Sequence, residues 1–193
     1  MVEISGKYKI GTRRFGSINW IGAWTLYKKE VLRFLIVWIQ TLFSPLITSL
    51  LFLSVLSLAI GNDRGDVLGV PFIIFLAPGL IAMQIIQQAF SHSSSSFMIG
   101  KIQGNIVDLV YAPLSAGEVT LAVTLASVTR SVLIAIISLL VFYLFIDFEI
   151  KNLLTLITFT FLSAFSLGAL GIIAGLWAEK FDHMATVTNF III

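Results

Sequence analysis

The stretch "VTLAVTLASVTRSVLIAIISLLVFYLFI", residues 119–146, decides the fold of this chain, because Arg130 is its one charged residue. About 20 helical apolar residues cross the hydrocarbon core of a bilayer. At about 1.5 Å per residue, this run would reach about 42 Å as a helix. Lipid offers no partners for open backbone groups, so the run is predicted to be a membrane-spanning helix.

Three more apolar runs have spanning length: 34–60, 70–90 and 153–178. A fifth begins near Met184 and continues to Ile193, where the sequence ends. None shows the strict alternation that is typical of membrane strands. The predicted fold is therefore all-α: one polytopic membrane bundle over 1–193, with a cytoplasmic N-terminus and interfacial helix at 1–33 and the transmembrane part at 34–193.

The composition agrees with lipid as the surrounding solvent. Hydrophobic residues make up 58% of the chain, charged residues 11%, and the mean hydropathy is +1.02. A soluble domain has about 25% charged residues. The absence of cysteine excludes disulfides and thiolate metal sites. His92 and His183 do not have the spacing of metal ligands, so no metal site is expected.

Positive charge is concentrated near the N-terminus. Seven of the 12 Lys and Arg residues lie in the first 33 positions: Lys7, Lys9, Arg13, Arg14, Lys28, Lys29 and Arg33. Such a cluster could bind nucleic acid, but the spanning run that follows favours a role in membrane orientation, with no nucleic-acid partner. The positive-inside rule then places the N-terminus and 91–118 in the cytoplasm of a multi-pass plasma-membrane protein, and Arg64 and Lys151 outside.

The segment 17–33 is predicted to form a helix in the headgroup layer. Trp20, Trp24 and Tyr27 recur at helical spacing and share one face. The three cations of this segment, Lys28, Lys29 and Arg33, fall mostly on other faces. An aromatic face beside a basic face is typical of an interfacial helix, which serves as an anchor or as a lever on the first span.

A half-polar segment, "GKIQGNIVDLVYAPLSAGEV" (100–119), separates two spans. Ile102, Ile106, Leu109 and Val110 share one face of a predicted short helix that ends at Pro113. A helix this short is not stable alone, so it needs a partner surface. In one reading that surface is the membrane or the rest of the same bundle. In the other reading it is another protein.

Ser115 and Glu118 stand just before the run 119–146. A serine followed three residues later by glutamate predicts a capping box, in which each side chain binds the other residue's backbone amide. The third spanning helix is therefore expected to begin with a fixed cap.

Several ordered motifs resemble the type-2 ABC transporter permeases, in particular the bacterial drug-type exporters. They are "WTLYKKEVLRFLIVWIQTLFSPLITSLLF" (24–52), "FLAPGLIAMQIIQQAF" (75–90), "FMIGKIQGNIVDLVYAPLSAGEVTLA" (97–122) and "GLWAEKFDHMATVTNFIII" (175–193). The third is the most specific, because in that family a similar segment forms the coupling helix that inserts into a cleft of the ATPase subunit.

The resemblance implies a coupling helix around 100–114 that contacts an ATPase. The implied coupling residues are Lys101, Gln103, Gly104, Asp108, Leu109 and Pro113. It also implies a permease rather than an enzyme. The partner subunit would bind ATP and Mg²⁺, and this chain would bind no cofactor. Two copies would pair as a homodimer in the lipid of the bacterial inner membrane and export an amphiphile such as a drug or lipid. Since family members continue beyond a fifth span, the chain is expected to be truncated there.

Four other features carry predictions. Arg130 is expected near the cytoplasmic boundary, snorkelling or paired inside the bundle. Gly171 and Gly175 have the spacing of a close helix contact, within one subunit or between two. The serines of 91–96 are interpreted as a polar exit from the membrane. Pro45 and Pro78 are expected to kink their spans.

Two other classes of function stay open at this point. A membrane-embedded lipid-modifying enzyme would need a cluster of acidic residues or histidines, and those of this chain are scattered. A non-transporting membrane scaffold would need only the hydrophobic spans.

Overall fold

The computed structural model describes residues 18–60, 66, 67, 69–146 and 152–192. The predictions for Lys7, Lys9, Arg13, Arg14, Arg64 and Lys151 lie outside these residues. The described elements are α1 (Trp20–Ile36), a π-helix (Ile39–Phe43), α2 (Ser44–Ile60), α3 (Phe72–Ile102), α4 (Ile106–Tyr111), α5 (Ala116–Tyr143), α6 (Leu153–Trp177) and α7 (Phe181–Ile192).

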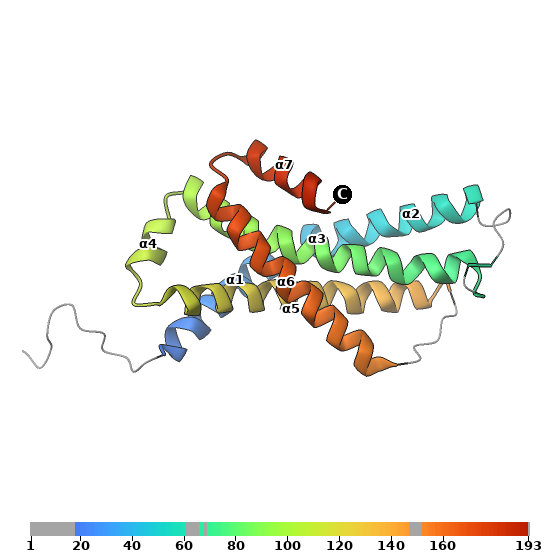
Figure 1. Cartoon of the computed structure of the whole chain (residues 1–193), viewed down its shortest axis with the longest axis horizontal. Coiled ribbons are helices and arrows are strands. Elements are labelled where there is room, and N and C mark those ends of the chain that lie inside the picture. The colour runs from blue at the N-terminus through green and yellow to red at the C-terminus, as the bar shows by residue number, and fades with distance from the viewer. Residues whose placement is uncertain (1–17, 61–65, 68, 147–151, 193) are drawn as a thin grey trace, which may run out of the picture.

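Four segments are long and apolar enough to cross a membrane: Ile39–Ala59, α3, α5 and α6. The prediction of an all-α polytopic bundle is confirmed. α3 and α5 lie side by side along the long axis, and α6 crosses both (Figure 1). α2 lies against α3, while α4 forms the connection at the end of the bundle where α3 finishes and α5 begins.

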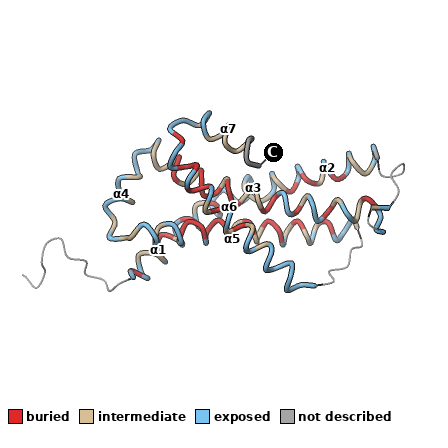
Figure 2. Tube along the Cα trace, in the orientation of Figure 1, coloured by how far each residue is buried: buried red, intermediate tan, exposed pale blue. Residues whose placement is uncertain are grey.

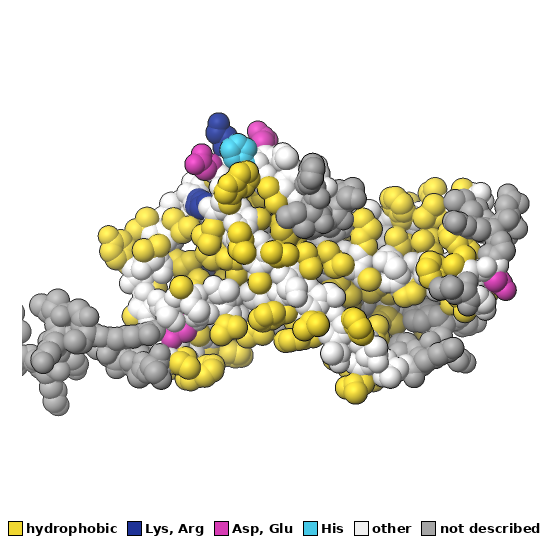
Figure 3. Space-filling model, viewed as in Figure 1, with side chains coloured by type: hydrophobic (Ala, Val, Ile, Leu, Met, Phe, Trp, Pro, Cys, Tyr) yellow, Lys and Arg dark blue, Asp and Glu magenta, His cyan; other side chains and the backbone are white. Residues whose placement is uncertain are grey.

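Burial follows this arrangement. The buried residues gather where α3, α5 and α6 face one another, and much of α2 and α6 is exposed (Figure 2). The central cluster includes Ala77, Ile81, Val128, Phe142 and Ala164. Hydrophobic side chains cover long parts of the visible face, whereas the charged ones lie mostly toward its edges (Figure 3). A bundle with an apolar exterior is what a lipid environment requires.

α6 crosses α3 at close range. A methyl group added at Gly171 would lie 2.5 Å from the Phe90 carbonyl oxygen, and one at Gly175 would lie 2.6 Å from that of Ser94. These glycines therefore allow the backbones to approach, as small residues do in membrane bundles. The prediction of a close glycine contact is confirmed, and the contact lies within one chain.

The serine tract has a packing role inside the bundle. His92, Ser93 and Ser94 are buried in the interior of α3, which continues to Ile102. Ser93 and Ser94 are small residues against which α6 packs, and this use was hidden because the α6 partner lies about 80 residues further along the chain. The interpretation of 91–96 as a polar exit from the membrane stays a prediction.

Two span boundaries also differ from prediction. Phe34 belongs to α1, and the first span begins with the π-helix at Ile39. Pro45 has no N–H to donate to the Thr41 carbonyl four residues earlier, and a proline at this place favours the local change to π-helical hydrogen bonding. The second span is longer than 70–90, because α3 includes the Ser-rich stretch that hydropathy excluded.

Candidate functional site

The segment 100–114 consists of the end of one helix, a turn and a short second helix. Lys101 and Ile102 are the last residues of α3, and α4 begins at Ile106. Gly104 has a φ of 76° in the turn between them, a conformation that glycine adopts without steric cost. The single helix predicted around 100–114 is thus wrong in its bounds.

α4 has an inner and an outer side. Ile106 and Leu109 pack against a buried cluster that includes Leu26, Phe97 and Val123. The outer side exposes large apolar side chains at the end of the bundle. We call these residues the α4 tip: Val107 (51% exposed), Val110 (76%) and Tyr111 (84%). The predicted common face of Ile102, Ile106, Leu109 and Val110 is therefore split, since Ile102 and Val110 are exposed.

The other predicted coupling residues occupy different positions around α4. Gln103, Gly104 and Asp108 are exposed beside the α4 tip. The Lys101 ammonium donates to the backbone carbonyls of Leu176 and Ala178, the latter at 3.0 Å. A cation there satisfies carbonyls at the C-terminal end of α6, so Lys101 holds α3 to α6.

Glu118 joins α1 to the start of α5. Its Oε2 accepts from the Ser115 backbone amide at 2.6 Å, and the Glu118 amide donates to Ser115 Oγ at 3.3 Å. Both hydrogen bonds of the capping box are thus present. Its Oε1 also accepts from the Asn19 backbone amide at 2.7 Å, a contact between residues 99 positions apart.

Asn19 completes this junction. Its Nδ2 donates to the Pro113 carbonyl at 3.1 Å, and its Oδ1 accepts from the Gly22 amide at 2.9 Å, which caps α1. A Cβ at Gly22 would lie 2.7 Å from Leu114 Cδ2. We call Asn19, Pro113, Ser115 and Glu118 the capping junction; it ties α1, the α4–α5 turn and α5 together.

The rest of α1 follows α5. Tyr27 hydrogen-bonds through its hydroxyl to Thr129 Oγ1 at 2.9 Å and stacks on Trp24 at 5.1 Å between ring centroids. Trp20 and Trp24 are 73% and 65% exposed, and Lys28 and Lys29 are also exposed. Trp20, Trp24, Lys28 and Lys29, predicted for an interfacial helix, are therefore at the surface. Tyr27 also contacts the bundle, and Arg33 turns inward to pair with Glu30.

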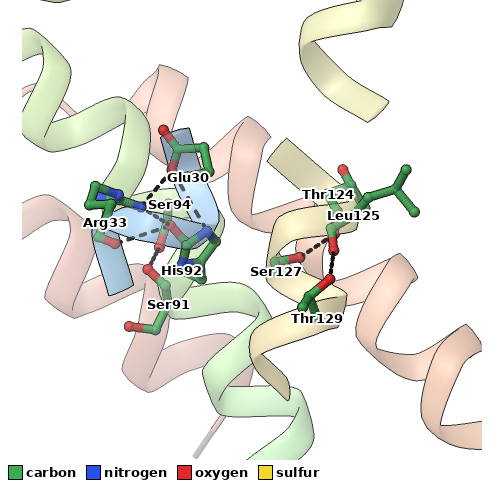
Figure 4. Close-up of polar contacts among 10 residues, drawn as sticks. Glu30, Arg33, Ser91, His92, Ser94, Thr124, Leu125, Ser127 and Thr129 are labelled. Atoms are coloured by element: carbon green, nitrogen blue, oxygen red, sulfur yellow. Dashed lines mark hydrogen bonds and ion pairs between the residues drawn. The ribbon is translucent and has the colours of Figure 1, made fainter. Parts of the chain in front are cut away.

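A buried polar cluster lies near the end of α1 (Figure 4). Glu30 pairs with Arg33 at 2.9 Å and lies 3.7 Å from His92 Nε2. Arg33 also donates to the His92 carbonyl at 3.3 Å, and Phe34 contacts the His92 ring edge-on. Sequence reasoning missed Glu30, although its spacing of four from both Leu26 and Phe34 places it on the buried face of α1.

A groove of about 1030 Å³ lies beside this cluster, bounded by the end of α1, the π-helix, α2 and α3. Arg130 reaches it from α5 and donates to Gln88 Oε1 at 2.6 Å. Arg130 is therefore paired inside the bundle with an uncharged amide. Nearby, Gln84 donates to the Pro45 carbonyl and accepts from Ser138 Oγ, each at 2.9 Å, which links α2, α3 and α5.

The chain is similar to inner-membrane transport permeases. The ABC-2 type transporter family model matches residues 22–193. Over 175 residues the chain is 29% identical to the inner membrane transport permease YadH of Escherichia coli K12. The matched region covers 91% of this chain and 68% of the relative. The YadH proteins of E. coli O157:H7 and Shigella flexneri match to the same extent. No solved structure gives a significant match. Because this family model covers nearly all of the chain, including α4 and the start of α5, the chain belongs to the ABC-2 type transporter family, the membrane permease subunits of ABC transporters.

Proposed function

We propose that this chain is the membrane half of an ABC exporter in which the α4 tip receives an ATPase subunit. The family implies an ABC ATPase partner in general, and the relatives support a multi-pass inner-membrane protein. In the proposal, the N-terminus and α4 face the cytoplasm and two copies of the chain pair. The partner binds ATP and Mg²⁺, and the cargo is an amphiphile of the lipid-like or drug-like class.

The observation that carries the proposal is the exposure of the α4 tip. Val110 and Tyr111 are more than three-quarters exposed, on a six-residue helix at one end of the bundle. A helix this short is marginal in isolation, so a partner that covers its exposed side would add to the packing on its inner side. Aromatic and aliphatic anchors surrounded by polar residues are typical of protein interfaces, and Gln103 and Asp108 supply polar neighbours.

The inner side of α4 supports a mechanical role. Ile106 and Leu109 pack against the buried cluster that contains Leu26 of α1 and Val123 of α5. The capping junction joins the same two helices through hydrogen bonds to the Glu118 carboxylate. When ATP binding draws the ATPase pair together, a displacement of α4 would therefore move α1 and α5 with it, because packed side chains transmit rather than absorb such shifts.

Co-purification with an ABC ATPase subunit from the same organism tests the proposal. The double variant Val110→Ala, Tyr111→Ala removes the exposed part of the α4 tip. Truncating two interface anchors costs on the order of 2 kcal/mol or more, so we expect at least about tenfold weaker binding of the ATPase and loss of permease-stimulated ATP hydrolysis.

The matched control is Phe159→Ala, which truncates an exposed aromatic side chain (67%) on the spanning helix α6. This variant should bind and stimulate the ATPase as wild type does. If the α4 tip variant retains full binding and stimulation while eluting as a single folded species, the ATPase docks elsewhere and the proposal is wrong.

A further inference from the structure

We propose that the groove between α1, α2 and α3 is a binding site for an amphiphile with an anionic head group, held by Arg130 and Arg33. The proposal rests on the proposed function in one respect only, namely that the bound amphiphile would be transported outward. Binding to the groove requires no ATPase, so it is tested separately.

The charge of the groove is the first observation. Its lining contains Arg33, Arg130 and His92, and no Asp or Glu. Arg33 has a carboxylate partner in Glu30 at 2.9 Å. Arg130 is paired with Gln88, an uncharged side chain. In the described residues, no carboxylate lies within ion-pair distance of Arg130. The groove thus carries one positive charge that no acidic side chain of these residues balances.

The depth of Arg130 makes this charge significant. Arg130 lies 14 residues from the start of α5 and 13 from its end, which places it about 20 Å of helix from either end. A charge at such depth is costly unless it is paired or solvated, and it marks a functional site by default. An anion in the groove would supply the missing partner.

Unused hydrogen-bond donors are the second observation. The Nε atoms of Arg33 and Arg130 are buried without an acceptor among the described residues, and both nitrogens of the His92 ring also lack a hydrogen-bond partner there. The guanidinium fork matches the two oxygens of a phosphate or carboxylate. A phosphate or carboxylate head group therefore fits both the charge and the donors of this site.

The distribution of polarity argues for an amphiphile rather than a free anion. Along α3 the lining runs from Gln103 to Leu80, about 35 Å of helix. The middle of the groove, beside the arginines, carries Gln88, Ser91, His92 and Ser95. Toward the Leu80 end the lining gains large apolar side chains, Leu80, Met83 and Phe52 of α2, beside the polar Thr48, Ser49 and Gln84. A head group would lie at the arginines and an apolar tail would extend along α2 and α3 toward Phe52.

The test measures binding to the purified permease in detergent, with dodecyl phosphate and dodecyltrimethylammonium as matched probes. Wild type should bind dodecyl phosphate at least about tenfold more tightly than the cationic probe, as expected when a charge-assisted contact is gained. Inorganic phosphate alone should bind far more weakly than dodecyl phosphate, because it has no tail. Equal binding of the two probes, or of free phosphate, would overturn the proposal.

Gln88→Glu is the decisive variant. It is isosteric and places a carboxylate where Arg130 already donates, so the fold is retained while the free charge is neutralised. Dodecyl phosphate affinity should fall at least about tenfold. Arg130→Lys, which keeps the charge but lacks the guanidinium fork, should lose less affinity than Gln88→Glu. Asn152→Asp makes the same chemical change at the exposed N-cap of α6, outside the groove, and should bind as wild type.

Nanodiscs distinguish the source of the amphiphile. If dodecyl phosphate binds more weakly in phosphatidylglycerol discs than in phosphatidylcholine discs, the site accepts membrane lipid. If it binds equally in both, the site selects another anionic amphiphile as cargo. Absence of dodecyl phosphate binding in wild type would show that something else, such as the second copy, covers the groove, and would overturn the proposal. Intact binding without ATPase stimulation would count against the proposed function alone.

Discussion

Replacing Glu118 should uncouple α1 from α5 because its carboxylate holds both. Glu118 is buried, and its two oxygens accept from the Ser115 amide at 2.6 Å and the Asn19 amide at 2.7 Å. Glu118→Ala removes both acceptors and leaves the buried Asn19 amide without the carboxylate that it binds.

The expected magnitude follows from these two contacts. A hydrogen bond to a charged group contributes about 1.5–3 kcal/mol. The Ser115 amide is only partly buried, so water can replace some of its loss. We therefore expect Glu118→Ala to cost about 3 kcal/mol. Glu118→Gln keeps one oxygen but turns an N–H toward the other amide, and should cost about half as much.

Hydrogen exchange of the peptide that contains Asn19 measures this effect locally. Exchange should accelerate roughly 100-fold in Glu118→Ala, as about 3 kcal/mol implies, and roughly tenfold in Glu118→Gln. The midpoint of thermal unfolding in detergent should fall by about 6–12 °C in the alanine variant. Thr120→Ala, exposed on the first turns of α5, is the matched control and should leave exchange unchanged.

Wild-type protection of Asn19 in Glu118→Ala would refute this reasoning, because the carboxylate would then not hold α1. Equal effects of the alanine and glutamine variants would refute the part of it that depends on charge.

Gly104→Val should cost roughly 1–2 kcal/mol of stability, since a side chain opposes its positive φ. It should also reduce ATPase stimulation by redirecting α4. Gly117→Ala, where added atoms meet open space, should leave both stability and stimulation unchanged. Gly171→Leu should destabilise the bundle by about 1–3 kcal/mol in chemical unfolding by forcing α6 from α3, whereas Gly79→Ala should not overpack, because its Cβ has no neighbour within 4 Å. Lys101→Met should raise hydrogen exchange at the end of α6 by a few fold, as expected for losing about 0.3–1 kcal/mol of helix-terminus interaction.

Sequence reasoning succeeded for features whose cause lies within one helix. Four spanning segments follow from hydropathy alone, because every residue of a lipid-exposed helix meets the same solvent. The capping box of Ser115 and Glu118 follows from a spacing of three residues. The glycine pair of α6 shows its small size directly in the sequence, although not which helix it contacts.

The tertiary structure decided the contacts between segments far apart in the chain. Glu118 also binds Asn19, Lys101 caps α6, and Glu30 meets His92, and none of these pairs has a local sequence signal. The polarity of Ser93 and Ser94 is a property of each residue, whereas their burial depends on the α6 glycines that face them. The same holds for the groove: hydropathy identifies the helices that enter the membrane, but only their packing sets Arg130 beside Gln88 with no acidic side chain in the lining.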